Sequence, residues 1–502
     1  MSYLIIMEIK FINEHDYSCP VEFDMTRHGN RRVDRRTFIQ TGSAIGIASI
    51  AGCMGGGDDG EASAPSDVEP ASSISFISES TPPSVAINEI IDEFTEETGI
   101  EVDITLTPFE NYSERLASDI NSQSGNIQVF YADPYVVSSR YYPDMEPLDP
   151  YIESDEHADI PNGIDDFIES HLDACGYFGD GEYLRGLPYD CPTMLWAYRT
   201  DIVENYGDQA ESDLGFPFEP GRERTWEEYY QMAEWINENV DEVEYGTGHQ
   251  AQQHDSLQCD FHNVFWAYGG EDVEGFSGRM DDEWPDDPQP NFSGENGVEA
   301  ARFYNRLLDI AHPGSTSWTW DGVGQAFAQS EIAMTPEWHE FNAMFANPDD
   351  SQVSENVGWA LLPQGSDRPV NLYGGAGLAI NGYSTDAEKA AAWEFLVWAT
   401  SPEVQMRALE MAGGTPTRHS VYEREEVQQA AEQPTEESEY PNVVPPVQEA
   451  WTADYVGMRP KPPRWLELNE VLYSELSGMI AGNKSPEETM QAVDDGWSNT
   501  LQ

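Results

Sequence analysis

Acidic and aromatic side chains stand at the ends of two predicted strands in the N-terminal part of the chain. Glu79 closes the stretch Ile-Ser-Phe-Ile-Ser, and Tyr131 and Asp133 come at the end of a predicted strand at 127–131. Ligands of open α/β sheets bind beyond the carboxyl ends of the strands, so these side chains are candidate ligand contacts. A carboxylate accepts hydrogen bonds and a phenol donates or accepts them, which suits a polar solute. Asp133 could equally cap the turn before Pro134.

Paired carboxylates could also perform acid–base catalysis. A glycoside hydrolase uses two carboxyl groups about 5 to 9.5 Å apart, and the 93 acidic residues of this chain will supply some such pairs by chance. The sequence contains no Gly-x-Ser-x-Gly elbow, no Walker A loop and no Cys-x-x-Cys or His-Glu-x-x-His metal pattern. We therefore expect no catalytic residues, no metal and no cofactor, and a secreted glycoside hydrolase is the least favoured interpretation.

Predicted strands and helices alternate around these candidates. A strand from Ile74 is followed by a helix over 85–98, a strand over 100–106 and a helix over 112–121, each with apolar residues at the spacing that its structure requires. Gly99 is expected to end the first helix. The order strand, helix, strand, helix, strand predicts a doubly wound parallel sheet in an α/β protein.

Capping boxes mark further helices along the chain. In such a box, a Thr or Ser and a Glu three residues later satisfy the free N–H groups at the start of a helix. The boxes predict helix starts at Thr225, Thr385 and Ser485. Short buried strands are expected at 357–362 and 377–380, where apolar residues run together.

Acidic residues dominate the composition. The 502 residues include 93 acidic and 24 basic ones, which gives a formal net charge of −69. Nucleic acid binding needs Lys and Arg against phosphates, so this charge excludes a nucleic acid partner. Repulsion on this scale is screened in about 1 M salt, where the Debye length falls to about 3 Å, so we interpret the acidic surface as an adaptation to brine. The 14 Trp, 24 Tyr and 20 Phe residues supply a large core, which argues against disorder.

Residues 25–53 have the organisation of an export signal. A basic segment with Arg35 and Arg36 precedes a short apolar run that ends in Ile-Ala-Gly-Cys53. Paired arginines are typical of the twin-arginine route, and the run is too short for a membrane span, which needs about 20 apolar residues. Ile-Ala-Gly-Cys is similar to a lipobox, which predicts that Cys53 is lipidated.

The segments on either side of this signal lack features of a folded domain. Residues 1–24 are expected to be a non-native or mis-assigned extension, and 54–72 a flexible acidic linker between lipid and domain. Three cysteines remain beyond the linker, Cys175, Cys191 and Cys259. An exported protein permits a disulfide, but the sequence cannot select which two of the three would pair.

Eight further stretches line up, in order, with one family. In these stretches the sequence resembles the extracellular solute-binding proteins of ABC importers, in particular the family-1 sugar binders similar to maltose-binding protein. Each stretch is short, but their common order over about 74–497 is specific. The stretches are 186–190, 195–201, 224–228, 326–338, 357–363, 373–380, 413–418 and 481–488.

The sequence departs from the family pattern in three places. Ser330 stands where the family usually has glycine, and Cys191 lies beside the expected cleft. An acidic, turn-rich insertion at 271–291 interrupts the resemblance and is expected on the surface. These departures leave the expected fold in place, and the first two could alter the ligand.

The resemblance implies the fold of type II periplasmic binding proteins. In this fold crossover strands join two α/β lobes, which close on a ligand by a hinge motion. The chain would visit each lobe twice, with the first part of lobe 1 at 73–188, the first part of lobe 2 at 189–358, the return to lobe 1 at 359–412, and the return to lobe 2 with the C-terminal helices at 413–502.

The resemblance also implies a function and partners. The protein would capture a mono- or oligosaccharide outside the cell and deliver it to the transmembrane subunits of an ABC permease, as a monomer held to the membrane by its lipid. Sugars have apolar faces and hydroxyl rims, so their sites combine aromatic rings with polar side chains. Glu79, Tyr131 and Asp133 would contact the hydroxyls. A peptide, polyamine or other organic solute on the same fold is the alternative.

Further ligand contacts follow from positions in the family. Trp338 matches the Trp that stacks on the sugar, although a Trp is more often a core residue. Tyr189 and Asp190 occupy the first crossover, where Asp190 could instead bind hinge backbone. Gly375 and Gly377 could let the backbone approach the ligand, or they could allow tight strand packing.

Four more residues are candidates of lower rank. Arg418 is one of few arginines in an acidic protein and is expected to pair with a carboxylate, which could belong to the site or to the protein framework. His262 and Trp266 could reach the ligand or lie on a buried helix face. Trp465 is the weakest candidate of the four.

Overall fold

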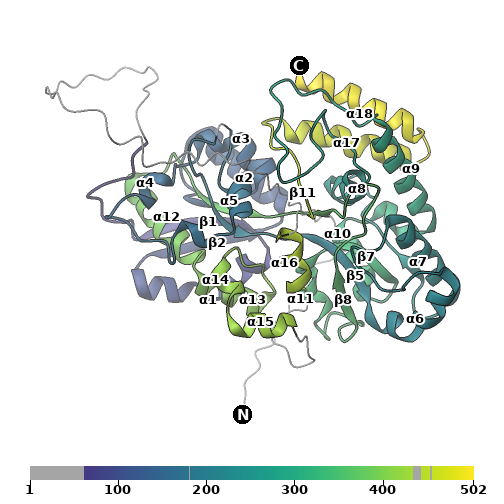
Figure 1. Ribbon diagram of the computed structural model, residues 1–502. Helices are drawn as coiled ribbons and strands as arrows, with labels where there is room; N and C mark the ends of the chain where they lie inside the picture. Colours follow the sequence, from purple (N-terminus) through teal and green to yellow (C-terminus); the bar gives the residue numbers. More distant parts are fainter. Residues whose placement is uncertain (1–61, 180, 433–442, 453–454) are drawn as a thin grey trace, which may run out of the picture.

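Two α/β lobes lie side by side and are joined by crossing segments (Figure 1). The expected two-lobed fold is therefore confirmed. The export signal with Arg35, Arg36 and Cys53 lies outside the part of the chain that the structure describes. The computed structural model describes residues 62–179, 181–432, 443–452 and 455–502.

Lobe 1 is built on a five-stranded sheet with the strand order β2-β1-β3-β10-β4. Strand β1 pairs in parallel with β2 and β3, whereas β10 runs antiparallel to both β3 and β4. The carboxyl ends of β1, β2, β3 and β4 therefore share one edge of the sheet. The strands are β1 Ser73–Glu79, β2 Glu101–Thr107, β3 Val129–Ala132, β4 Leu187–Asp190 and β10 Ala376–Ile380.

Helix α1 Pro82–Thr98 illustrates how the sequence builds the layer of helices on this sheet. Ile87, Ile90 and Phe94 recur at helical spacing and are buried. Gly99 ends the helix as predicted, with a φ of 76° that only glycine adopts without strain. The other helices of lobe 1 are α2 Phe109–Ser122, α3 Ser139–Tyr141, α4 Asp149–Ile152, α5 Glu169–Cys175, α12 Asp386–Ala399 and α13 Pro402–Ala412.

Lobe 2 is built on a four-stranded sheet with the strand order β6-β7-β5-β8. Strand β5 is antiparallel to β7 and β8, and β6 is parallel to β7, so the carboxyl ends of β6 and β7 lie beside the start of β5. The strands are β5 Met194–Arg199, β6 Tyr245–Thr247, β7 Ile332–Trp338 and β8 Val357–Ala360. The helices are α6 Thr200–Leu214, α7 Trp226–Asn239, α8 Asp255–Ala267, α9 Glu295–Ile310, α10 Trp320–Ala328 and α11 Asn342–Phe345, with α17 Trp465–Ile480 and α18 Pro486–Leu501 against α8 and α9 (Figure 1).

The three predicted capping boxes are confirmed. Thr225, Thr385 and Ser485 each precede a helix and accept a hydrogen bond from the backbone N–H three residues later, and the Glu at that position bonds back to the cap backbone. A capping residue of this kind stabilises a helix by about 1 kcal/mol. The local sequence therefore fixes the starts of α7, α12 and α18.

Two crossovers between the lobes run side by side. Thr193, between β4 and β5, forms an antiparallel bridge with Tyr373, between β8 and β10. The backbone N–H of Gly374 donates to the carbonyl of Pro192 at 2.5 Å. Strands β9 Asn371–Leu372 and β11 Val456–Gly457 form a further short parallel pair. The paired crossovers are the expected site of hinge motion.

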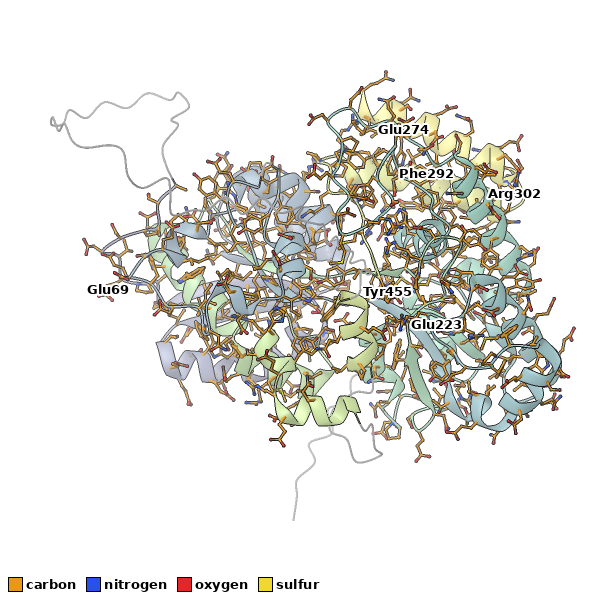
Figure 2. The ribbon with its side chains drawn as sticks, in the orientation of Figure 1. Glu69, Glu223, Glu274, Phe292, Arg302 and Tyr455 are labelled. Carbon is orange, nitrogen blue, oxygen red and sulfur yellow. The ribbon has the colours of Figure 1, made fainter. Side chains whose placement is uncertain are left out.

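The last part of the chain first contacts lobe 1 and then lobe 2. The Thr417 carbonyl accepts a hydrogen bond from the Ile168 N–H, and the Thr417 hydroxyl donates to the Pro188 carbonyl. This segment therefore contacts lobe 1, whereas the sequence predicted that the return to lobe 2 begins at 413. Tyr455 and Glu223 lie near the middle of the molecule, where Arg222 donates to the Tyr455 hydroxyl at 3.0 Å (Figure 2). The remaining helices are α14 His419–Tyr422, α15 Glu425–Glu432 and α16 Val444–Thr452.

Ser330 occupies a position whose backbone favours glycine. Its φ is 64°, in the left-handed region that side chains with a Cβ rarely adopt. The Ser330 hydroxyl accepts a hydrogen bond from Arg199 at 2.5 Å. This bond offsets part of the backbone strain and explains how a serine is tolerated there.

Candidate binding site between the lobes

Residues at the facing edges of the two sheets form the candidate site. In lobe 1 the carboxyl ends of β1, β3 and β4 carry Glu79, Asp133 and Asp190. In lobe 2 the carboxyl end of β7 carries Glu337 and Trp338, and Trp338 pairs with Met194 at the end of the first crossover. Both edges therefore adjoin the crossovers, and the structure brings strand-end residues of both lobes together.

Asp133 caps a turn and also lies at the border between the lobes. One oxygen of its buried carboxyl accepts hydrogen bonds from the backbone N–H groups of Tyr135 and Val136, at 3.0 and 2.6 Å, at the start of the π-helical turn η2 Pro134–Ser138. Burial raises the pKa of Asp133 to about 8, against the effect of these N–H groups, and Asp255 of lobe 2 raises it further. The capping role that the sequence left open is present.

Two predicted aromatic residues lie behind the acidic edge of lobe 1. The ring of Tyr131 lies between those of Tyr112 and Tyr189, with centroid distances of 5.8 and 6.3 Å. The hydroxyl of Tyr189 donates to Ser84 Oγ at 3.0 Å. Both Tyr131 and Tyr189 are buried. These contacts make the two rings a support for the strand ends rather than an exposed stacking surface.

Three carboxyl groups meet where the lobes touch. Asp190 lies beside Glu340 of the 3-10 turn η6 His339–Phe341, which follows β7, and Glu79 also acts on Glu340. Asp190 is completely buried and Glu79 is 5% exposed. Burial, followed by the charge of Asp190, raises the pKa of Glu340 well above its ordinary value. Glu340 was not among the predicted site residues.

Lobe 2 presents a second polar group at the ends of β6 and β7. The amide nitrogen of Gln250 donates to Glu337 Oε1 at 3.1 Å, and the same oxygen accepts from the backbone N–H of Trp338 at 2.8 Å. Gln250 Oε1 and Glu337 Oε2 are buried without a hydrogen-bond partner among the described residues. Burial raises the pKa of Glu337 well above its ordinary value. The Trp338 side chain beside this pair is 4% exposed.

A cation and two aromatic rings also connect the lobes. The Arg459 guanidinium lies over the ring of Tyr135 at 4.4 Å and over that of Trp465 at 5.6 Å. Tyr135 and Trp465, from η2 and α17, are themselves 5.8 Å apart. Arg459 Nη1 is 3.9 Å from Asp255, the first residue of α8. The structure therefore brings the weak candidate Trp465 to the border between the lobes.

Framework contacts hold Arg418, although its Nη2 is buried without a hydrogen-bond partner among the described residues. It is completely buried, its Nε donates to the Thr400 carbonyl at 2.9 Å, and its guanidinium lies 3.6 Å from the centre of the Phe167 ring. Its carboxylate partner is Asp166, at 3.6 Å. These contacts explain the burial of Arg418 without a ligand.

His262 and Trp266 lie on the buried face of α8. His262 Nε2 is 3.0 Å from one oxygen of Asp272, and Trp266 Nε1 donates to the other at 2.6 Å. Both side chains are completely buried, and their rings are 4.3 Å apart. Asp272 is thus the hydrogen-bond partner of both side chains inside lobe 2, as expected for residues on a buried helix face.

Backbone conformation explains the glycine at position 375, and close packing explains the glycine at position 377. Gly375 has a φ of 149°, which side chains with a Cβ rarely adopt. A Cβ on Gly377 would lie 3.1 Å from the Cys175 carbonyl oxygen, because α5 ends over this strand. Tight packing therefore accounts for Gly377.

The described residues contain neither a metal-binding cluster nor a helix that could span a membrane. Within them, no three or more His, Cys, Asp and Glu side chains are arranged to hold a metal ion. No helix in the same part of the chain has both the length and the apolar character of a membrane span.

Similarity to known proteins extends over most of the chain. Residues 78–406 match the family described as bacterial extracellular solute-binding protein. A probable amino-acid ABC transporter periplasmic-binding protein of Sinorhizobium fredii is 24% identical over 420 residues, which cover 80% of this chain and 83% of that protein. An erythritol/L-threitol-binding protein of Mycolicibacterium smegmatis is 22% identical over 429 residues, with 78% and 83% covered.

Solved structures support the same conclusion about the fold. The maltose-bound MalE3 of T. maritima superimposes with a TM-score of 0.70 at 19% identity, over 85% of this chain and 99% of that one. Its two-lobed architecture agrees with the sheets and crossovers described above. Since the family match covers more than half of the chain, this protein belongs to the bacterial extracellular solute-binding proteins of ABC transporters.

Proposed function

We propose that this solute-binding protein captures a small polyhydroxylated solute, a sugar or a polyol, between its lobes and delivers it unchanged to a membrane permease. The observation that carries the proposal is the set of buried hydrogen-bond acceptors without partners at the facing strand ends. In lobe 2 these are Gln250 Oε1 and Glu337 Oε2. A solute with several hydroxyl groups supplies the donors that these atoms lack.

The protein without a ligand carries an energetic penalty at this site. A buried acceptor without a partner costs about 1 to 3 kcal/mol, and Gln250 and Glu337 each carry one. Ligand hydroxyls between the lobes would remove this penalty, so binding would favour the closed arrangement. Trp338, beside the same pair, is our proposed stacking ring for the apolar face of the solute.

The relatives support this class of solute and also keep one alternative open. One is named for erythritol and L-threitol, and one solved neighbour holds maltose. The Sinorhizobium relative is named for amino acids, so a peptide, polyamine or other organic solute is the alternative. The acidic strand ends are compatible with a cationic solute as well as with hydroxyls.

We propose no catalytic activity for these residues. The family and fold are those of non-enzymatic solute-binding proteins, so the carboxyl groups would bind hydroxyls rather than hydrolyse a glycoside. Release of a shorter sugar during incubation with an oligosaccharide would revive the hydrolase interpretation. Recovery of the unchanged oligosaccharide supports capture.

Membrane attachment is a further part of the proposal. We infer that Arg35 and Arg36 direct twin-arginine export and that lipid on Cys53 holds the protein, as a monomer, outside the cell near its permease. Changing Cys53 to Ser should release active binder into the medium. A variant that stays on the membrane would contradict the lipobox interpretation.

A thermal-shift screen of sugars and polyols in molar salt tests the solute class. A solute at about 100 times its dissociation constant stabilises the protein by about 2.7 kcal/mol. Glu337→Gln should reduce the shift, whereas Glu274→Gln is the matched control, because Glu274 is exposed on the outer side of lobe 2 (Figure 2). If amines or peptides shift the transition and no hydroxylated solute does, the proposed class is wrong.

A further inference from the structure

The cluster of Glu79, Asp190 and Glu340 differs from the other polar groups at the border between the lobes. Glu79 ends β1, Asp190 ends β4, and Glu340 follows β7 in η6. Two of these carboxyl groups therefore belong to lobe 1 and one to lobe 2. The hinge motion expected of the two lobes would bring these groups together on closing and separate them on opening.

Among the described residues, Asp190 and Glu340 have no compensating positive charge beside them. Neither forms an ion pair with Lys, Arg or His within the described part of the chain, and the charged groups acting on Glu340 are the acids Asp190 and Glu79. An ionised carboxylate that is buried beside other acids is unstable unless a positive charge pairs with it. The buried cluster can therefore be neutralised only by a bound proton or by a cation that a ligand supplies.

Asp190 supplies an independent sign of a missing ligand. Its side chain is completely buried. Glu340, Thr81 and the Cys191 backbone lie beside it, but among the described residues no contact with the distance and angle of a regular hydrogen bond reaches either of its two oxygens. A buried carboxylate with two open oxygens fits a ligand group that offers several donors.

We propose that Glu79, Asp190 and Glu340 form a subsite for an ammonium group, so that the preferred solute carries an amine beside its hydroxyls. An ammonium group has a positive charge and three N–H donors, which match the two open oxygens of Asp190 and the open Oε1 of Glu340. Because the subsite spans the lobes, the bound amine would also hold them closed. This inference rests on the proposed capture of a hydroxylated solute in the same cleft.

Protonation explains how the empty cluster tolerates closure. Burial raises the pKa of Asp190 and that of Glu340, which favours a bound proton on the pair in the empty protein. Tyr189 and Cys191 also adjoin the pair, and neither carries a positive charge. An ammonium group entering the subsite would take the place of this proton as the compensating charge.

Matched pairs of solutes test the proposal at one pH and one salt concentration. Sorbitol and its amine 1-amino-1-deoxysorbitol form one pair, and glucose and glucosamine form another; putrescine supplies an amine without hydroxyls. Isothermal titration of the purified protein should give at least a ten-fold lower Kd for the amine of a pair. Asp190→Asn or Glu340→Gln should abolish this preference, whereas Glu337→Gln should weaken both members equally.

Each result decides between the proposals. Equal or tighter binding of the neutral members would overturn the ammonium subsite and leave the hydroxylated solute in place. Putrescine binding as tightly as the amino polyol would overturn the hydroxylated solute and keep the subsite. Absence of binding by every probe would contradict both. An amine preference that survives in folded Asp190→Asn and Glu340→Gln would assign the amine to other residues.

Discussion

Replacing Asp133 with Asn should remove the contribution of this one carboxyl group to the pH dependence of stability. Asp133 is 1% exposed, and burial raises its pKa from 3.8 to about 8, so its carboxyl keeps its proton at neutral pH in the folded protein. In the unfolded chain the same carboxyl ionises above about pH 4. The Asn amide resembles the protonated acid, and its oxygen can accept the same N–H bonds from Tyr135 and Val136.

The sign and size of the effect follow from linkage. Below about pH 4 the carboxyl is protonated in both states, so its contribution to stability is fully present, and it is lost as pH rises from about 4 to about 8. A shift of about four pKa units at about 1.4 kcal/mol each gives about 6 kcal/mol. This value is an upper limit, because any water that reaches Asp133 in the folded protein lowers the desolvation that raises its pKa.

Urea denaturation at constant molar salt, between pH 4 and pH 8, measures the effect. Asp133→Asn and wild type should have similar free energies of unfolding at pH 4, and the variant should be more stable by several kcal/mol at pH 8. Asp133→Ala is the control, since it loses the cap and should be less stable than the Asn variant by about 1 kcal/mol at every pH. Parallel pH profiles for wild type and Asp133→Asn would show that the two N–H groups keep Asp133 ionised.

Four further predictions concern Arg418, the cysteines, the surface charge and Trp338. Arg418→Lys should lower the free energy of unfolding by about 2 kcal/mol in urea melts, because Lys cannot make the same fork of contacts. The solute affinity of this variant should equal that of wild type, and lost affinity at unchanged stability would place Arg418 in the site. Oxidised glutathione should join Cys175 to Cys191, whose buried thiols act on each other, and peptide mapping should find Cys259 free; a disulfide to Cys259 contradicts this. Lowering the salt from about 1 M to about 0.01 M, where the Debye length is about 30 Å, should destabilise a chain of net charge −69; salt-independent melting refutes the brine interpretation. Trp338→Ala should weaken solute binding at least ten-fold while circular dichroism shows a retained fold; unchanged affinity removes Trp338 from the site.

Local signals predicted much of the architecture. The capping boxes at Thr225, Thr385 and Ser485 and the stop at Gly99 appear as expected, because each depends on residues within one helical turn. The strand predicted at 127–131 is observed at Val129–Ala132, a shift of the kind that strand ends allow. Contacts between residues that are close in the sequence can therefore be predicted from the sequence alone.

The acidic side of the site was predictable for one lobe and missed for the other. Glu79 and Asp133 follow from the rule that ligands meet the carboxyl ends of strands, whereas Asp190 was predicted from its position in the family. Gln250 and Glu337 obey the same rule, but β6 has only three residues and gives no periodic signal. Applying the rule to β7 would have found Glu337 beside Trp338.

Residues with distant partners could not be interpreted from the sequence. Arg418 is explained by Asp166, with more than two hundred residues between them, and by the Phe167 ring beside it. The role proposed for Glu340 depends on its contact with Asp190 in the other lobe. Such pairs arise only from the folded arrangement, so residue type alone left framework and ligand roles equally open.

Calorimetric titration of the purified protein in molar salt, with the best hydroxylated solute from the screen, tests the central claim most directly. We predict saturable binding of one solute per chain, an at least ten-fold loss of affinity in Glu337→Gln with none in Glu274→Gln, and recovery of the solute chemically unchanged. Binding that is identical in Glu337→Gln, or conversion of the solute into a product, would contradict capture at the facing strand ends of the two lobes.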